Sequence, residues 1–577
     1  MGVSSMKMNK ILAVAATASV FALSACGGAN NGDGSDGADQ SAAKQPAAGV
    51  APNTDPLPQP EVGQLYNNPQ ERDAVKDGGT LTLSIGEIPP NFNGFNIDGN
   101  TVYTTNIDNW TSPTLWNFTE SGEASPDKDY LLSAELVSED PETVKYVLNP
   151  DAKWNNGDQI TWKAFETTWK TQSGKSDKYN PAATDGYENI ESVKKGENEK
   201  EAIVTFKKSF YPYETLFGNL EHPKNLDAKF YKTGWVNDPH NELRAGPYKV
   251  GDHSKTELTL VPNPEWWGEK PKLDKVVYKQ MESSASINAF QNGEIDATGV
   301  GTADRLAQIK DMEDVQLRRG FDSSVAVYTF GQDSPLFEND YARKAFSLST
   351  DRKQLQEIAY KGLDWEEPLP GSEVLYPWMP TYTDNLDGFE HDVDAAKKLM
   401  EDNGWTMNDD GYYAKDGKVA EFKYVNFGDD PISDARARAQ QSMSKKAGLK
   451  MEIDNKKSAD FSKTVTSGAF DVIIMRWSQG DPYGYAWACQ LYCSDSESNF
   501  SGVGSDEVDK MMKKVTTVAD QDEALKLANE AETKALAQFG TLPLSNGPDM
   551  SAVKKGLANY GPSGWLVEEP ENIGWEK

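Results

Sequence analysis

The residue types that most often carry out chemistry in proteins are scarce and scattered in this chain of 577 residues. Its four histidines stand apart, and the sequence has no His-Glu-x-x-His zinc motif, no Gly-x-Ser-x-Gly nucleophile turn and no Gly-x-x-x-x-Gly-Lys-Ser/Thr phosphate loop. The 90 acidic side chains could supply the carboxylate pair of a glycosidase, but no local pattern marks such a pair. Binding is therefore favoured over catalysis, a surface-anchored hydrolase is the less favoured alternative, and no metal or cofactor is expected.

The first of the three cysteines, Cys26, follows a targeting segment. Lys7 and Lys10 precede an uncharged apolar run, 11–23, which is shorter than the ~20 residues that a membrane-spanning helix needs. The sequence Leu-Ser-Ala-Cys at 23–26 resembles the lipobox of bacterial lipoproteins. This resemblance implies that 1–25 is a removed signal peptide and that the Cys26 thiol attaches lipid at the extracytoplasmic face of the cell membrane. An ordinary signal peptide cleaved near residue 25 is the alternative.

The other two cysteines are spaced four apart, at Cys489 and Cys493. On a helix or a tight turn this spacing brings the Cα atoms to ~6 Å, which a disulfide tolerates. Two thiols without a nearby histidine or further cysteine cannot complete a tetrahedral zinc site, and outside the cell a disulfide is favoured. We therefore expect a disulfide and no metal.

Composition limits the partners. The formal net charge is -32, and loss of two lysines with the signal peptide makes it -34, so the surface repels nucleic acid and anionic lipid. Residues 26–77 are rich in small and polar side chains and are predicted to form a flexible tether. The roughly 500 remaining residues suffice for two or three folded units. The 15 tryptophans and 23 tyrosines suit ligand clefts, although many such rings belong to cores.

Periodicity in the second half predicts an α/β layer. Strands are expected at 420–427, 449–454 and 472–475, with helices at 435–448 and 459–468 between them. The uninterrupted apolar run at 472–475 is typical of a strand covered on both faces, so we expect a parallel sheet.

Ligands of such sheets bind beyond the carboxyl ends of the strands, and here that place is occupied by Arg-Trp-Ser-Gln-Gly-Asp-Pro-Tyr. We predict that the segment 476–483 lines a pocket, with Asp481 offering a carboxylate to a ligand ammonium. In the alternative interpretation Asp481 only caps the next turn and Trp477 packs in the core. Arg476 could pair with Asp481, but neighbouring strand residues point to opposite faces.

Several motifs, in order, resemble those of family 5 extracellular solute-binding proteins of ABC importers, which carry oligopeptides and dipeptides. They are Trp-x-x-Gly at 154–157, Gly-Pro-Tyr at 246–248, Asn-Pro-x-Trp-Trp at 263–267, Gly-Glu-Ile-Asp at 293–296 and Arg-x-Ala at 343–345, followed by Asp-Arg at 351–352. The likeness extends over nearly the whole folded chain.

The resemblance implies an α/β, two-lobed periplasmic-binding-protein-like fold whose hinge is crossed twice. Lobe one would comprise 78–325, with an inserted subdomain at about 106–239, and would be completed by the C-terminal return at 536–577. Lobe two would comprise 326–535.

The resemblance also implies a peptide ligand, ABC permease subunits as partners and a monomer. The family's usual spacing places the ammonium-binding aspartate where this chain has Gly480, one position before Asp481. An oligosaccharide binder of the same fold remains the alternative, since both ligands use aromatic walls. The full predicted ligand-binding set is Asn106, Trp110, Arg476, Trp477, Ser478, Gln479, Gly480, Asp481 and Tyr483.

Overall fold

The computed structural model of the chain describes residues 59–60, 67–119, 122–386, 388–566 and 568–577. The predicted signal peptide, Cys26 and most of the predicted tether lie outside these residues. Within the described part of the chain, no helix is both long and apolar enough to cross a membrane.

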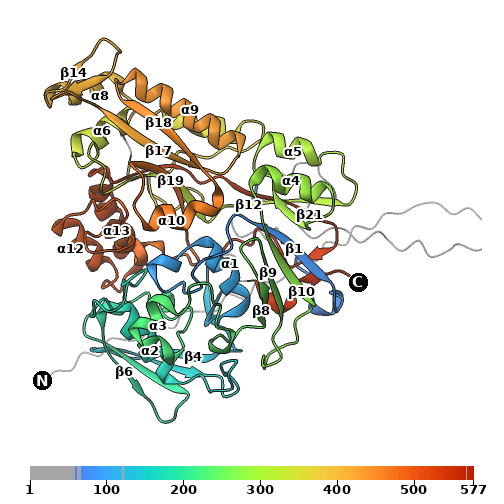
Figure 1. Cartoon of the computed structure of the whole chain (residues 1–577). Coiled ribbons are helices and arrows are strands. Elements are labelled where there is room, and N and C mark those ends of the chain that lie inside the picture. The colour runs from blue at the N-terminus through green and yellow to red at the C-terminus, as the bar shows by residue number, and fades with distance from the viewer. Residues whose placement is uncertain (1–58, 61–66, 120–121, 387, 567) are drawn as a thin grey trace, which may run out of the picture. The chain divides into compact units, whose positions relative to one another are not determined.

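The first large sheet has seven strands in the order β12-β21-β11-β1-β10-β9-β8, and β1 and β10 run parallel (Figure 1). Leucine and isoleucine side chains alternate inward along β1 and form its core with β10. The strands are β1 (Thr80–Ile85), β8 (Tyr248–His253), β9 (Glu257–Pro262), β10 (Lys275–Gln280), β11 (Ala297–Gly299), β12 (Val315–Phe321) and β21 (Pro548–Lys554). The neighbouring helices are α1 (Val102–Thr111), α4 (Ser283–Gln291) and α5 (Ala303–Ile309).

The second sheet has five strands in the order β18-β17-β19-β13-β20. Its strands are β13 (Ser324–Phe330), β17 (Glu421–Phe427), β18 (Lys450–Lys456), β19 (Val472–Ser478) and β20 (Thr541–Ser545). The predicted parallel layer is present, because β17 runs parallel to both β18 and β19. The sheet as a whole is mixed, since β13 pairs antiparallel with β19 and β20.

Within the described residues, eight helices accompany the second sheet, and two of them, α9 and α10, lie where the sequence predicts helices. Asp351 caps one of the eight by accepting a hydrogen bond from the Gln354 amide at 2.9 Å. They are α6 (Asp340–Ser349), α7 (Arg352–Tyr360), α8 (Val393–Asp402), α9 (Pro431–Lys446), α10 (Phe461–Thr466), α11 (Ala488–Tyr492), α12 (Asp506–Val515) and α13 (Gln521–Leu536). A small sheet contains β14 (Thr406–Met407), β15 (Tyr413–Lys415) and β16 (Lys418–Val419). The last two are joined through the positive φ angles of Asp416 and Gly417.

The chain passes between the two large sheets twice. The first crossing is 322–323, between β12 of one sheet and β13 of the other. The second crossing is 546–547, between β20 and β21. Sheet membership therefore favours a return to lobe one at 546, later than the predicted 536, because β20 completes the lobe-two sheet.

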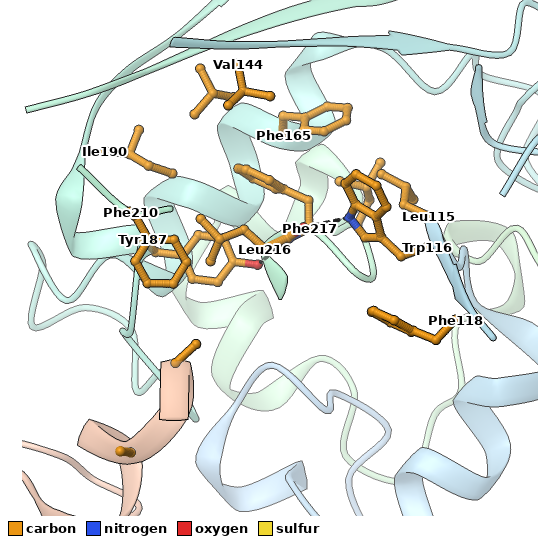
Figure 2. Packing of buried hydrophobic residues seen from close by; sticks show 14 of the residues in the cluster. Leu115, Trp116, Phe118, Val144, Phe165, Tyr187, Ile190, Phe210, Leu216 and Phe217 are labelled. Atoms are coloured by element: carbon orange, nitrogen blue, oxygen red, sulfur yellow. Dashed lines mark hydrogen bonds between the residues drawn. The ribbon is translucent and has the colours of Figure 1, made fainter. Parts of the chain in front are cut away.

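A separate four-stranded sheet, β4-β5-β7-β6, lies within the range predicted for the inserted subdomain. Figure 2 shows part of its core, where Phe165, Tyr187, Leu216 and Phe217 pack together and the Tyr187 hydroxyl accepts a hydrogen bond from the Phe217 amide. Its elements are β4 (Leu131–Glu139), β5 (Glu142–Leu148), β6 (Ile190–Lys195), β7 (Glu201–Phe206), α2 (Trp162–Gln172) and α3 (Ala228–Thr233). The two-stranded sheets are β2 (Trp116–Phe118) with β3 (Ala124–Pro126), and β22 (Leu557–Ala558) with β23 (Gly574–Trp575).

The folded body begins earlier than the predicted residue 78. Asn67 and Asn68 are buried, and the Asn68 amide nitrogen donates to the Leu557 carbonyl and to Glu576 at 3.0 and 2.9 Å. Val75 is fully buried and bridges to Glu576. These residues are polar or isolated in sequence, so composition alone assigned them to the tether.

Two acidic side chains are buried together in lobe two. Glu532 accepts hydrogen bonds from the Ser372 and Tyr492 hydroxyls, the Asn385 amide and the Glu373 backbone. Glu373 accepts one from the Thr541 hydroxyl. Burial, together with the negative charge of the neighbouring Glu532, raises the pKa of Glu373 to about 8. Glu373 is therefore largely protonated at neutral pH.

Candidate functional site

The carboxyl end of β19 lies against the first crossing. Arg476 pairs with Ala326 in the sheet and directs its guanidinium to Asp322, with Nη2 to Oδ2 at 2.6 Å. The same group donates to the Ser324 hydroxyl at 2.9 Å and to the Asn546 carbonyl of the second crossing. Arg476 therefore joins the two crossings in this structure, and its ion-pair partner is Asp322 and not Asp481.

The second crossing is held by Glu367, which sequence reasoning missed. Its carboxylate accepts hydrogen bonds from the backbone amides of Asn546 and Gly547, and the shortest distance to each nitrogen is 3.0 Å. It also accepts from the Tyr360 hydroxyl at 2.6 Å and the Trp365 indole at 2.9 Å. Four donors on one carboxylate fix this crossing, and no local sequence signal pointed to it because the donors come from distant segments.

Aromatic rings surround the first crossing. Trp378 donates from its indole to the Asp322 carbonyl at 3.1 Å and stacks on Phe321, with ring centroids 5.5 Å apart. Trp565, from the C-terminal segment, packs on Trp378 at 5.4 Å. The Tyr376 hydroxyl donates to the Ser323 carbonyl at 2.9 Å. These rings form a wall beside the polar groups of the crossing.

The contacts of Asp481 match the alternative interpretation, in which this residue only caps the turn that follows. Its Oδ1 accepts from the Tyr483 amide at 2.8 Å and its Oδ2 accepts from the Trp487 indole at 3.1 Å. Burial raises its pKa, and these two hydrogen bonds lower it in part. Both oxygens are thus engaged in shaping the turn after β19, which leaves Asp481 poorly placed to receive a ligand ammonium.

The other predicted residues of this segment divide into engaged and exposed groups. Trp477 stacks on Phe500 with ring centroids 6.0 Å apart. The backbone amide of Gln479 donates to the Ser323 carbonyl, and its side-chain nitrogen donates to the Val374 carbonyl. Ser478 and Gly480 are exposed. Tyr483 is half-buried, and its ring lies 6.5 Å from that of Phe118 in the inserted subdomain.

The two predicted residues of α1 are linked to each other through Tyr278. Trp110 is 5% exposed, and its indole donates to the Tyr278 hydroxyl at 3.0 Å, which gives it the contacts of a core residue. The Tyr278 hydroxyl in turn donates to the Asn106 carbonyl at 3.3 Å.

Asp549 and Tyr560 were also missed by sequence reasoning. Asp549 lies at the start of β21. Desolvation and the negative charge of Asp322 raise the pKa of Asp549 to about 7, although the positive charge of Arg476 lowers it in part. Burial raises the pKa of Tyr560 to about 12. A surface acid within a -32 chain carries no sequence signal, so only the fold could reveal its position.

Away from the crossings, the two lobes touch through carboxylate and serine pairs. Glu87 of lobe one accepts from the Ser462 hydroxyl at 2.7 Å and from its amide at 3.3 Å. Glu282 accepts from the Ser458 amide and hydroxyl at 3.0 and 2.6 Å. In the reverse direction, Asp429 of lobe two accepts from the amide and hydroxyl of Ser284 in α4. We call these three pairs the latch.

Cys489 and Cys493 occupy α11 and its end, with Cα atoms 4.7 Å apart and their sulfurs in a disulfide. Cys493 is fully buried. The short helix turn brings the two side chains together as their spacing predicts.

The family follows from sequence comparison. Residues 128–499, more than half of the chain, match the model described as "Bacterial extracellular solute-binding proteins, family 5 Middle". The chain belongs to this family. It is therefore a solute-binding protein of an ABC importer and not an enzyme. Proteins of this family are extracytoplasmic.

Relatives and solved structures agree with this membership. The solute-binding protein is 31% identical over 506 residues to the oligopeptide-binding protein OppA of Mycobacterium tuberculosis, covering 86% of this chain and 85% of that protein. Its fold is similar to that of AppA of Bacillus subtilis in complex with a nonapeptide, with a TM-score of 0.76, 19% identity and coverage of 87% and 100%. It is also similar to the periplasmic EDTA-binding protein EppA, with a TM-score of 0.74, 22% identity and coverage of 90% and 100%.

The structural matches confirm the two-lobed α/β fold, but their ligands differ. AppA holds a nonapeptide and EppA is a binder of EDTA, so the fold alone does not choose the ligand of this solute-binding protein.

Proposed function

We propose that the chain captures oligopeptides between its two lobes and delivers them to an ABC permease in the membrane. The observation that carries this proposal is the 31% identity with the mycobacterial oligopeptide-binding protein OppA over most of both chains. At that identity and coverage a shared ligand class is the simplest inference, whereas the structural matches below 25% identity support the fold alone.

The chemistry at the crossings is consistent with a peptide. Ser478 and Gly480 are exposed at the carboxyl end of β19, where an extended backbone can bind by strand-like hydrogen bonds. Trp378, half-buried at the first crossing, and Tyr483, half-buried near Phe118 of the inserted subdomain, supply ring surface in this region. We propose that the segment 476–483 lines the ligand site, that Arg476, Trp477, Gln479 and Asp481 act by shaping it, and that Asn106 borders it from α1.

We further propose that the protein is a monomer tethered by lipid at Cys26 on the extracytoplasmic face. The motif at 23–26 supports the anchor, and the C26S variant tests it. This variant should leave the membrane and appear in the medium, whereas normal membrane attachment of C26S would contradict the anchor.

The proposed ligand class is tested by binding to defined pools. A pool of synthetic random pentapeptides and a matched pool of neutral oligosaccharides are each added to purified protein, and the melting temperature and the radius of gyration are measured. The peptide pool should raise the melting temperature by mass action and shrink the radius of gyration as the lobes close. Stabilisation by the oligosaccharides alone would favour the alternative ligand.

A further inference from the structure

We propose that the Cys489–Cys493 disulfide positions a loop of lobe two, 493–499, which holds the inserted subdomain when the lobes are closed. We call this segment the disulfide loop. The disulfide thereby acts on ligand affinity rather than on the stability of the domain. This inference rests on the proposed capture of a ligand between the lobes, and it adds a positioning group to that function.

The inserted subdomain packs directly on lobe two in this structure. The Ser498 hydroxyl of the disulfide loop donates to the Ala182 carbonyl of the subdomain at 2.5 Å, and Ser498 is 1% exposed. At the end of α12, the Thr516 carbonyl accepts from the Tyr211 amide at 2.9 Å. The subdomain lies between β1 and β8 of lobe one in the chain, so opening of the lobes would break these hydrogen bonds.

The disulfide loop takes its shape from α11 and from Cys493. The Cys493 carbonyl accepts hydrogen bonds from the Ser496 amide at 3.2 Å and from the Asn499 side chain at 3.1 Å. The Ser496 hydroxyl donates to the Gln490 carbonyl of α11 at 2.8 Å. The Gln490 side chain in turn donates to the Ser498 hydroxyl at 3.5 Å. The position of Ser498 therefore depends on how α11 ends.

The disulfide fixes the end of α11. This helix has five residues, Ala488–Tyr492, which is far fewer than the ~12 that an isolated helix needs to be stable in water. Its last turn is closed by a hydrogen bond from the Cys493 amide to the Cys489 carbonyl at 2.9 Å, and the disulfide joins the same two residues. The covalent bond therefore keeps this turn wound and keeps the Cys493 carbonyl in place for the disulfide loop.

Loss of the bond should loosen the end of α11 without displacing the whole helix. The Tyr492 hydroxyl donates to Glu532 of α13 at 2.8 Å, and Ala488 and Tyr492 are buried. These contacts hold α11 against lobe two independently of the sulfurs. The closed ring is also small, so the bond removes little chain entropy from the unfolded state. The expected effect is a local one, on the contact between Ser498 and Ala182.

The test compares the wild type with C489S/C493S, with S498A and with the variant that combines all three substitutions. S254A is the matched control, because the Ser254 hydroxyl donates to the Glu257 carbonyl within the turn between β8 and β9. Each protein is incubated with a pool of synthetic random pentapeptides at graded concentrations, and mass spectrometry of the retained peptides gives an apparent dissociation constant. Urea unfolding of the free proteins measures their stability.

C489S/C493S and S498A should each raise the apparent dissociation constant by about three- to tenfold, the range for one net hydrogen bond, whereas S254A should not. The combined variant should lose no more than either, because the bond acts through Ser498. C489S/C493S should unfold at nearly the same urea concentration as the wild type.

Three results would overturn the positioning role of the disulfide. They are wild-type affinity in C489S/C493S, additive losses in the combined variant, and a large fall in the stability of C489S/C493S, which would mean that the bond holds the domain as a whole. Retention of no peptide by the wild type would instead refute the proposed peptide-binding function, and the inference would fall with it.

Discussion

Removing one carboxylate of the latch should weaken ligand binding although it lies away from the crossings. Glu87 is 7% exposed and accepts two hydrogen bonds from Ser462 across the lobes. In an open form both groups would be hydrated, so only the net gain of the contact favours the closed form. For a buried, charge-assisted pair that gain is about 2 kcal/mol. Glu282 and Asp429 are more exposed, and their pairs contribute less, about 0.5–1 kcal/mol each.

When a protein closes over its ligand, any free energy lost from the closed state is lost from the binding free energy. A loss of about 2 kcal/mol in E87A therefore predicts a dissociation constant about thirtyfold higher, by the rule that 1.4 kcal/mol is tenfold. Isothermal titration with a retained pentapeptide measures this change, and small-angle scattering measures closure. The control is E257A, an exposed acid at the start of β9. Unchanged affinity and compaction in E87A, or an equal loss in E257A, would refute the latch.

Three further predictions follow from buried groups. The folded state holds the pKa of Glu373 at about 8, above the ordinary 4.5, so the free energy of unfolding should fall by on the order of 4 kcal/mol as pH rises from about 4.5 to about 8. Urea unfolding across that range should show a weaker pH dependence in E373Q than in the wild type. Equal pH dependence in the two proteins would contradict this. W110F should lower the free energy of unfolding by about 1–2 kcal/mol through the lost contact with Tyr278 while peptide affinity stays unchanged, and a selective loss of affinity would return Trp110 to the ligand site. Alkylation of the denatured, unreduced protein should find no free thiol at Cys489 or Cys493, and reduction should cost little stability because the closed loop is short; two free thiols would rule out the bond.

The sequence predicted those elements whose local pattern is strong. The strands 421–427, 450–456 and 472–478 and the helices between them lie where apolar periodicity indicated. The antiparallel pairing of β13 and β20 with this layer could not be predicted in the same way. Both strands lie far from β19 in sequence, so their register depends on tertiary packing.

That the segment 476–483 lines the ligand site stays a prediction, and the structure gives two of its residues other contacts than expected. Arg476 and Asp481 follow the buried strand as expected, but each is satisfied by partners that local spacing cannot reveal, namely Asp322 and Trp487. Glu367 gains its position only when distant segments meet at the second crossing. In the sequence, an acid with such distant partners looks the same as the many acids that are only solvated.

Native mass spectrometry of the purified protein with the ligand that accompanies it tests the central claim most directly. Peptides and sugars differ plainly in fragmentation, so the readout identifies the ligand class without prior choice of a probe. The account predicts that the bound mass fragments into peptides, most of them with a free amino end. A bound oligosaccharide, or a conversion of added peptide to products at an ordinary enzymatic rate, would contradict it.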